Sequence, residues 1–212
     1  MIASENDARE FVTQRAANAD SALNKLDRLA EMLVQENQRQ NLISKSSEDL
    51  LWLRHFADSA QLLDYVPRVT SDPWFDLGSG AGLPGIVVAI LEPSQPVVLI
   101  ESRKKRAGWL TMAIEQLDIP NCRVEGSRLE LVATERAGVV SARAFAPLPK
   151  LLRLSARFST KETHWVLPKG RSAAQELAQL PRPQRNLFHV EQSVTDVEAG
   201  ILVGKGRVTI AP

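Results

Sequence analysis

A glycine-rich segment constrains the fold of this chain more than any other feature. The stretch "WFDLGSGAGLPGIVVAI", residues 74–90, has a short apolar run, an acid at Asp76, four glycines in eight positions and a second apolar run. Glycines let backbone N–H groups approach a ligand closely, and the N-terminus of a following helix adds partial positive charge. The segment therefore predicts a strand, a ligand-binding turn and a helix.

The rest of the chain after residue 73 alternates short apolar runs with amphipathic stretches, which is typical of a parallel α/β sheet. We expect five strand–helix units and then a hairpin, with turn or bulge positions at Gly200 and at Gly204-Lys205-Gly206. The expected strands are 74–77, 97–101, 123–125, 139–142, 163–167, 186–192 and 201–204, the last continuing to 210. The expected helices are about 85–92, 103–118, 128–134, 147–158 and 171–179.

Residues from about 5 to 65 predict helices. In "DSALNKLDRLAEMLVQENQ" apolar residues recur every three or four positions after Asp20, a candidate N-cap. In "SSEDLLWLRHFADSAQLLDYV" Ser47 is the candidate cap of a second helix, and Pro67 ends it. Their apolar faces need a surface to cover, so we expect residues 1–70 to form a helical cap on a Rossmann-like core of residues 71–212, the whole being one domain.

Composition excludes several classes of protein. The 212 residues are 44% hydrophobic and 24% charged, which are globular values. No apolar run is long enough to cross a membrane, and the N-terminal "MIASENDAREF" lacks the apolar centre of a signal peptide. The single cysteine, Cys122, has no disulfide partner and no zinc-site companions. We expect a cytoplasmic monomer with no membrane partner and no metal.

The formal net charge of +1 conceals a segregation along the chain. Residues 136–185 carry ten Lys or Arg side chains and only two Asp or Glu. That block suggests a surface for an anionic partner, although charge alone leaves a solvated face that binds nothing equally open.

Two ligands compete for the glycine turn. Read from Gly80, "GAGLPG" matches G-x-G-x-x-G, and Glu101 ends the second strand where a dinucleotide fold places its ribose-binding acid. Against a nicotinamide enzyme, the glycines begin directly after an acid, and the residues beyond Glu101 leave little room for a second nucleotide-binding half and a substrate domain. The segment "DLGSGAG", residues 76–82, resembles instead the first motif of Rossmann-like class I S-adenosylmethionine-dependent methyltransferases.

Further motifs resemble one family of that class, the bacterial small-subunit ribosomal RNA methyltransferases G, also called glucose-inhibited division protein B. They run in order through "NLIS" at 41–44, "RHFADS" at 54–59, "DLGSGAGLPG" at 76–85, "ESRKKR" at 101–106, "SRLE" at 127–130, "SARAFA" at 141–146 and "LPKG" at 167–170. The chain departs from the family pattern at Ile43, where threonine is usual, at an inserted Ala142 and at Pro168.

The resemblance implies methylation of guanine N-7 in the 530 loop of 16S ribosomal RNA, with S-adenosylmethionine as donor and 16S RNA or the small ribosomal subunit as partner. An acid ending the second strand holds the donor's ribose in this class, and a residue pair after the third strand reads its adenine. Carried over by position, the donor site comprises Asp76, Gly78, Gly80, Gly82, Leu83, Glu101, Leu129, Glu130 and Arg143.

The expected chemistry needs no general base, because N-7 of guanine carries a free lone pair at neutral pH. We therefore assign no acid–base residue and expect catalysis by positioning, with Arg143 at the mouth of the site. Consistently, the fourth strand lacks the asparagine-proline-proline-aromatic run of adenine-N6 enzymes, and Cys122 is not in a proline-cysteine pair.

The basic block supplies the expected RNA contacts, for which we name Arg143, Phe145, Lys169 and Arg171. Phe145 either stacks on an unpaired base or belongs to the core. "SRKKR" at 102–106 is either a solvated first turn or a phosphate contact. His55 and Asp58 share a helical face and are expected to lock the helical cap to the sheet, with Arg54 pairing with Asp58.

Other functions stay open on the sequence alone. They are a methyltransferase of the same fold acting on another RNA or on a protein, a non-catalytic nucleotide- or RNA-binding module, and a dinucleotide oxidoreductase.

Overall fold

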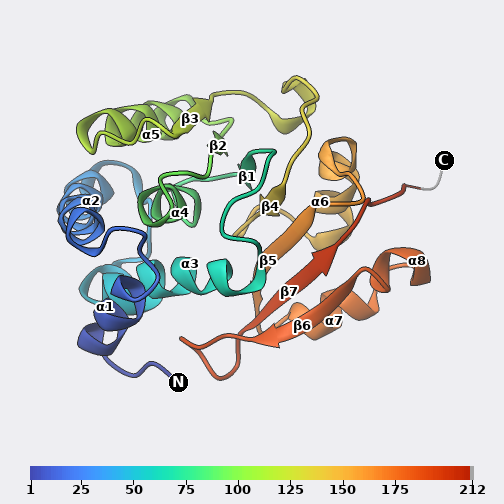
Figure 1. The fold of residues 1–212 in the computed structure, drawn as a ribbon, viewed down its shortest axis with the longest axis horizontal. Coiled ribbons are helices and arrows are strands. Elements are labelled where there is room, and N and C mark those ends of the chain that lie inside the picture. Colours follow the sequence, from blue (N-terminus) through green and yellow to red (C-terminus); the bar gives the residue numbers. More distant parts are fainter. Residues whose placement is uncertain (211–212) are drawn as a thin grey trace.

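A seven-stranded sheet with helices on both faces organises the chain in the computed structural model, which describes residues 1–210 (Figure 1). The strand order is β3-β2-β1-β4-β5-β7-β6, and only β7 runs antiparallel to its neighbours. The strands are β1 (Trp74–Leu77), β2 (Val97–Ile100), β3 (Cys122–Glu125), β4 (Val139–Ser141), β5 (His164–Gly170), β6 (Phe188–Gln192) and β7 (Gly200–Lys205). The mostly parallel sheet and its terminal hairpin are confirmed.

Alternating side chains of the strands divide the interior into two apolar layers. On β1, Trp74 packs into the layer beneath α4 (Gly85–Leu91) and α5 (Lys104–Gln116). Phe75 and Leu77 point to the opposite layer, which α6 (Leu148–Ser155) and α7 (Ala173–Ala178) cover. The central strands β1, β2 and β4 are buried on both faces, which explains why they appear in the sequence as continuous apolar runs.

The N-terminal helices extend the first of these layers. Helices α1 (Glu5–Thr13) and α2 (Ala19–Gln40) lie on the side of α4 and α5 (Figure 1), and fully buried residues such as Leu26 and Phe56 join the same apolar cluster as α4. Burial of each such side chain contributes roughly 1.5–3 kcal/mol to the free energy of folding. The expected helical cap is therefore present. The division of the chain into domains stays a prediction.

The two N-terminal caps that we predicted were wrong. Helix α2 is capped by Asn18, whose side-chain oxygen accepts the N–H of Ser21 at 3.1 Å, because Asn18 is extended whereas Asp20 already lies in the first turn. Ser47 caps nothing, since its hydroxyl donates to the carbonyl of Ser44 at 2.8 Å.

The segment around Ser47 is also not one continuous helix. It is divided into a 3-10 turn (Lys45–Leu50), a π-helical turn (Trp52–Ala57), helix α3 (Asp58–Ala60) and another 3-10 turn (Gln61–Tyr65). The carboxylate of Glu5 accepts the N–H groups of Trp52 and Leu53 at 3.0 and 2.8 Å, which satisfies donors exposed by the irregular winding.

Three further differences concern the α/β part. The helix expected at 128–134 is only a 3-10 turn (Leu129–Leu131), because Val132 is already extended. Strand β5 continues to Gly170, with a bulge where Pro168 has no N–H for the ladder. Strand β7 ends at Lys205 rather than continuing to 210, and the short helix α8 (Arg182–Arg185) was not expected.

Each helix in the described range is too short or too polar to cross a bilayer.

Candidate functional site

The candidate site lies where the order of the strands reverses. Strand β1 pairs with β2 on one side and with β4 on the other, so the segments that follow β1 and β4 meet at one edge of the sheet. In open α/β sheets, ligands bind in the crevice at such a switch point. Here it is formed by the glycine loop, residues 78–84, and by the segment 142–147 after β4.

Asp76 shapes the glycine loop from beneath. Its carboxylate is fully buried and accepts the N–H of Gly85 at 3.2 Å and the hydroxyl of Ser141 at 2.9 Å. Burial raises the pKa of Asp76 to about 6, although these hydrogen bonds oppose the change. Asp76 lines neither of the two cavities described below and lies behind the loop, so its predicted contact with the donor stays a prediction.

Two glycines of the loop are required by its close packing. Gly78 and Gly82 have φ angles of 68° and 93°, in the left-handed region. A Cβ atom on Gly78 would lie 2.4 Å from the ring of Phe145, and one on Gly82 would lie 2.4 Å from Ile86. Any side chain at either position would clash with its neighbours.

Glu101 ties the loop to the end of β2. Its side chain is 5% exposed, and its two oxygens accept the N–H groups of Gly80 at 3.1 Å and of Arg103 at 2.8 Å. Gly80 therefore contributes to the site through its backbone, and Glu101 is held in a fixed orientation.

A cavity of about 360 Å³, which we call the loop cavity, lies beside these residues. It brings together five residues predicted from the sequence, namely Gly78, Glu101, Leu129, Glu130 and Phe145. Leu129 is buried and Glu130 is exposed, so the pair offers a backbone and a side chain to the cavity. Two other predicted donor contacts, Gly82 and Leu83, lie outside its wall and pack into the loop or the core.

Several basic side chains at this cavity had not been assigned to the donor site. The set comprises Arg103, Arg106, Arg128 and Lys150. Arg103 and Arg106 belong to the "SRKKR" motif, for which the sequence left open a phosphate contact or a solvated turn. Their place in the lining of the cavity favours the phosphate contact. Arg128 precedes the Leu129–Glu130 pair within the "SRLE" motif, but it was not assigned a role from the sequence.

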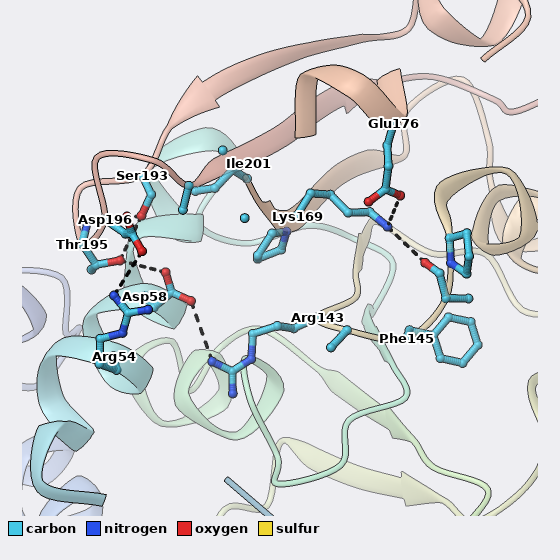
Figure 2. A pocket seen from close by; sticks show the side chains of 17 residues that line it. Arg54, Asp58, Arg143, Phe145, Lys169, Glu176, Ser193, Thr195, Asp196 and Ile201 are labelled. Carbon is cyan, nitrogen blue, oxygen red and sulfur yellow. Dashed lines mark hydrogen bonds and ion pairs between the residues drawn. The ribbon is translucent and has the colours of Figure 1, made fainter. Parts of the chain in front are cut away.

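A second cavity, of about 780 Å³, lies across segment 143–147 from the loop cavity, and we call it the hairpin cavity (Figure 2). Its walls come from the N-terminal helices, from the segment after β4, from the end of β5, from α7 and from the β6–β7 connection. It contains three cations and three carboxylates, namely Arg54, Arg143, Lys169, Asp58, Glu176 and Asp196.

Arg143 points into the hairpin cavity and toward the N-terminal helices. One of its terminal nitrogens donates to Nδ1 of His55 at 3.2 Å and lies 3.7 Å from Oδ2 of Asp58. The side chain is 24% exposed. Burial lowers the pKa of Arg143, and the nearby carboxylates of Asp58 and Asp76 oppose this. Arg143 was predicted to touch both donor and RNA, and the structure places it in the cavity on the far side from the glycine loop.

His55 is neutral in this arrangement. Burial lowers its pKa to about 3, and the charges of Arg143 and Arg54 add to the effect. Because arginine can only donate, Nδ1 of His55 accepts, and Nε2 carries the proton that it donates to the hydroxyl of Ser47 at 2.9 Å. His55 and Asp58 therefore do join the helical cap to the sheet, as expected.

The expected ion pair between Arg54 and Asp58 was wrong. Arg54 pairs with Asp196 of the β6–β7 connection at 3.3 Å, while Asp58 faces Arg143 (Figure 2). Residues of the hairpin were not identified from the sequence, because they carry no motif and come close to Arg54 only through the fold.

Phe145 belongs to both cavities. Its ring packs against Gly78, it is half-buried, and it borders the hydrophobic layer beneath α6. Ala144 and Ala146 also line both cavities, and Ala144 has a φ of 53°, unusual for a residue with a side chain. Segment 144–146 is thus the wall between the two cavities.

The two remaining predicted RNA contacts lie in different environments. Lys169 is 9% exposed, pairs with Glu176 at 3.1 Å and donates to the carbonyl of Ala146 at 3.1 Å. Burial raises the pKa of Glu176, but hydrogen bonds to its carboxylate outweigh this and lower it. Arg171 is 76% exposed, pairs with Glu198 and does not line the cavity.

Cys122 has no place in this site. It is buried on β3, where desolvation raises the pKa of its thiol to about 12, so it does not serve as a nucleophile. Within residues 1–210, no group of three or more His, Cys, Asp or Glu side chains is arranged to hold a metal ion.

Comparison with known proteins gives a consistent result. The family model described as GidB, rRNA small subunit methyltransferase G, matches residues 22–202. A ribosomal RNA small subunit methyltransferase G from Erythrobacter litoralis is 59% identical over 98% of this chain and 99% of its own length. One from Sphingopyxis alaskensis is 50% identical over 98% of this chain and 89% of its own length.

Solved structures share the fold at low sequence identity. A mutant of MtNAS in complex with S-adenosylmethionine has a TM-score of 0.55 at 17% identity, covering 86% of this chain and 75% of that one. A methyltransferase from Geobacter sulfurreducens also has a TM-score of 0.55, at 13% identity, covering 84% of this chain and 88% of that one. These likenesses confirm the class I methyltransferase fold.

Proposed function

Because the chain belongs to the small-subunit ribosomal RNA methyltransferase G family, we propose that it methylates N-7 of a guanine in the 530 loop of 16S ribosomal RNA with S-adenosylmethionine as donor. The observation that carries the proposal is the glycine loop at the strand reversal, held to the buried carboxylate of Glu101 beside a cavity. Membership of the family supports guanine N-7 of 16S RNA as the methyl acceptor, and the geometry of the loop cavity supports it as the binding site of the donor.

The residues of the loop cavity fit the donor. Each oxygen of Glu101 accepts one backbone N–H, and a carboxylate has lone pairs for about two more donors, so it can also accept ribose hydroxyls. Gly78 lines the cavity without a side chain. Leu129 and Glu130 offer a backbone N–H and a side chain to the adenine edge.

The reaction needs no general acid or base from the protein. When bound, S-adenosylmethionine supplies an electrophilic methyl group: the N-7 lone pair forms the new C–N bond, the C–S bond breaks with its electrons staying on sulfur, and the positive charge passes to the base. Since no proton is transferred, the residues of the site act by holding both partners in line and excluding water.

The hairpin cavity is the proposed site of the acceptor base. It shares the lining residues 144–146 with the loop cavity, so a base bound there lies next to a donor bound in the loop cavity. Lys169 and Arg143 supply positive charge on its inner side, and Phe145 supplies an aromatic face. We further propose that Arg171 and the basic rim of the loop cavity contact RNA phosphates, that 16S RNA or the small subunit is the substrate, and that the enzyme works as a single-domain monomer in the cytoplasm.

The test is methylation of 16S RNA and of small ribosomal subunits from cells that lack this modification. We expect 7-methylguanosine in the 530-loop fragment, identified by nuclease digestion and mass spectrometry. Failure to methylate either substrate would contradict the proposal. Methylation at another position or of another RNA would instead indicate a different acceptor.

A binding measurement separates the remaining alternatives. Isothermal titration with S-adenosylhomocysteine is expected to show micromolar binding, whereas NADH is expected to show none. Binding of S-adenosylhomocysteine without methylation of any RNA would indicate a non-catalytic module. Binding of NADH alone would indicate a dinucleotide enzyme.

A further inference from the structure

One carboxylate oxygen in the hairpin cavity accepts no hydrogen bond from the part of the chain that the structure describes. The oxygens of Glu176 accept from Ser172, from the N–H of Leu148 and from Lys169. Those of Asp196 accept from the N–H of Glu198 and from Arg54. The carboxylate of Asp58 differs from both.

Asp58 is held through one oxygen only. Its Oδ1 accepts the hydroxyl of Thr195 at 2.9 Å and the side-chain amide of Gln61 at 2.8 Å. Its Oδ2 faces Arg143 at 3.7 Å, which is longer than a direct hydrogen bond, and no hydrogen bond from residues 1–210 reaches this atom. Two donors on separate segments therefore fix the orientation of the carboxylate while Oδ2 keeps its lone pairs.

The position of Asp58 suits one edge of a guanine. Figure 2 shows Asp58 and Phe145 on opposite sides of the cavity, with Arg143 between them. A guanine whose N-7 faces the donor in the loop cavity directs its N1–H and amino group away from that cavity, because these groups lie on the opposite side of the purine. Enzymes that act on extruded bases read this Watson–Crick edge by hydrogen bonds.

We propose that Asp58 selects guanine as the acceptor, with Oδ2 accepting the N1–H of the base; this inference rests on the function proposed above. Adenine has an acceptor at N1 and leaves Oδ2 without a hydrogen bond, and a site that bonds a donor of its substrate rejects a base that lacks that donor. Arg143 partly balances the charge of Asp58 before the base enters.

The same contact favours the reaction. Methylation at N-7 leaves the base cationic, and positive charge on the ring makes N1–H more acidic. Its hydrogen bond to the carboxylate therefore strengthens as the methyl group is transferred, so the interaction is stronger in the transition state than in the bound substrate. Asp58 thus contributes to rate as well as to the choice of base.

The experiment pairs a change in the protein with a change in the base. Asp58→Asn and the wild-type protein are compared on a 530-loop RNA that carries either guanine or 2-aminopurine at the target, the latter keeping N-7 but lacking N1–H. We expect Asp58→Asn to lower kcat/KM on the guanine RNA by roughly 10- to 150-fold, the range for a hydrogen bond to a charged group. On 2-aminopurine RNA, we expect the two proteins to differ by less than about threefold, which is within the scatter of a lost neutral contact.

Controls distinguish base reading from a merely structural role. Asp196→Asn changes another carboxylate of the same cavity and is expected to affect both RNAs equally. Equal losses on both RNAs with Asp58→Asn would overturn the proposal, since a residue that only positions Arg143 does not sense N1–H. Unchanged turnover of the guanine RNA would overturn it too.

Two further measurements keep the test independent of folding and of the proposed function. Binding of S-adenosylhomocysteine by Asp58→Asn reports whether the variant is folded. If it is not, the wild-type protein alone tests the proposal, because equal kcat/KM on guanine and 2-aminopurine RNA would contradict it. If the wild type makes no 7-methylguanosine on the guanine RNA, the proposed function itself fails, and this inference with it.

Discussion

His55 illustrates at the residue scale how burial makes the joint between helices and sheet sensitive to acid. The pKa of His55 is about 3 in the folded protein against an ordinary value of 6.5. Between these two pH values, the unfolded chain therefore binds a proton at His55 that the folded protein does not bind. The stabilisation is fully present above pH 6.5 and is lost progressively as the pH falls toward 3.

From this we predict that lowering the pH from 7 to 5 removes about 2 kcal/mol of unfolding free energy through His55. In His55→Gln that part of the pH dependence is expected to disappear. Urea denaturation at the two pH values measures it. His189→Gln, which alters an exposed histidine on β6, serves as the control and is expected to keep the wild-type slope.

The position of Arg143 directly after strand β4 predicts that it is not a core residue. The structure instead shows a half-buried guanidinium bonded to His55. We still expect Arg143→Ala to be folded, with S-adenosylhomocysteine binding retained, while methyl transfer falls about 10- to 100-fold because the acceptor side loses a positioning group. Wild-type turnover in this variant would refute the role that we assign to Arg143.

At the scale of elements, the glycine loop depends on two backbone positions that cannot carry a side chain. Gly78→Ala places a methyl group against Phe145 and imposes roughly 1–2 kcal/mol of left-handed backbone strain. We expect at least a tenfold loss of S-adenosylhomocysteine affinity by calorimetry. In Gly108→Ala, where a Cβ meets nothing within 4 Å on α5, we expect unchanged binding and a gain of about 1 kcal/mol in stability.

The elements themselves were largely predictable. Central strands that are buried on both faces appear as apolar runs between turn residues, so β1 was placed where it lies; the other strands were placed within about three residues, except that β7 does not continue to 210. The helix expected at 128–134 failed because its pattern is short, and the structure has only a 3-10 turn there. Helical periodicity over so few residues does not determine a helix.

The candidate site was predictable only where a motif follows a strand. Glu101 and Gly78 were found because sequence order fixes their edge of the sheet. The partner of Arg54 was not, because local spacing points to Asp58 whereas the fold brings Asp196 from 142 positions away. The "SARAFA" motif covers residues 144–146, but that these residues line two cavities is likewise not predictable from the sequence.

At the scale of the whole molecule, the charge of the surface that we propose to face RNA is distributed differently from the basic block of the sequence. Lys169 and Arg171 are both engaged in ion pairs, whereas Arg103, Arg106, Arg128 and Lys150 surround the loop cavity. The chain therefore draws its cationic rim from three separate segments.

We predict that Arg103→Ala and Lys150→Ala each lower the slope of log affinity against log salt concentration by roughly 0.7–0.9, the value of one phosphate contact. The measurement is RNA binding at a series of salt concentrations. Arg28→Ala on α2, an exposed arginine away from both cavities, is expected to leave the slope unchanged.

The wall formed by residues 144–146 has a thermodynamic consequence for the whole molecule. Because one segment lines both cavities, a ligand that orders it on one side lowers the cost of ordering it for a ligand on the other. The donor product and the RNA are then expected to raise each other's affinity, and linkage requires the two factors to be equal. Calorimetry of each ligand with and without the other gives two independent measurements of that factor. A factor above one means that the donor and the RNA bind to the enzyme cooperatively.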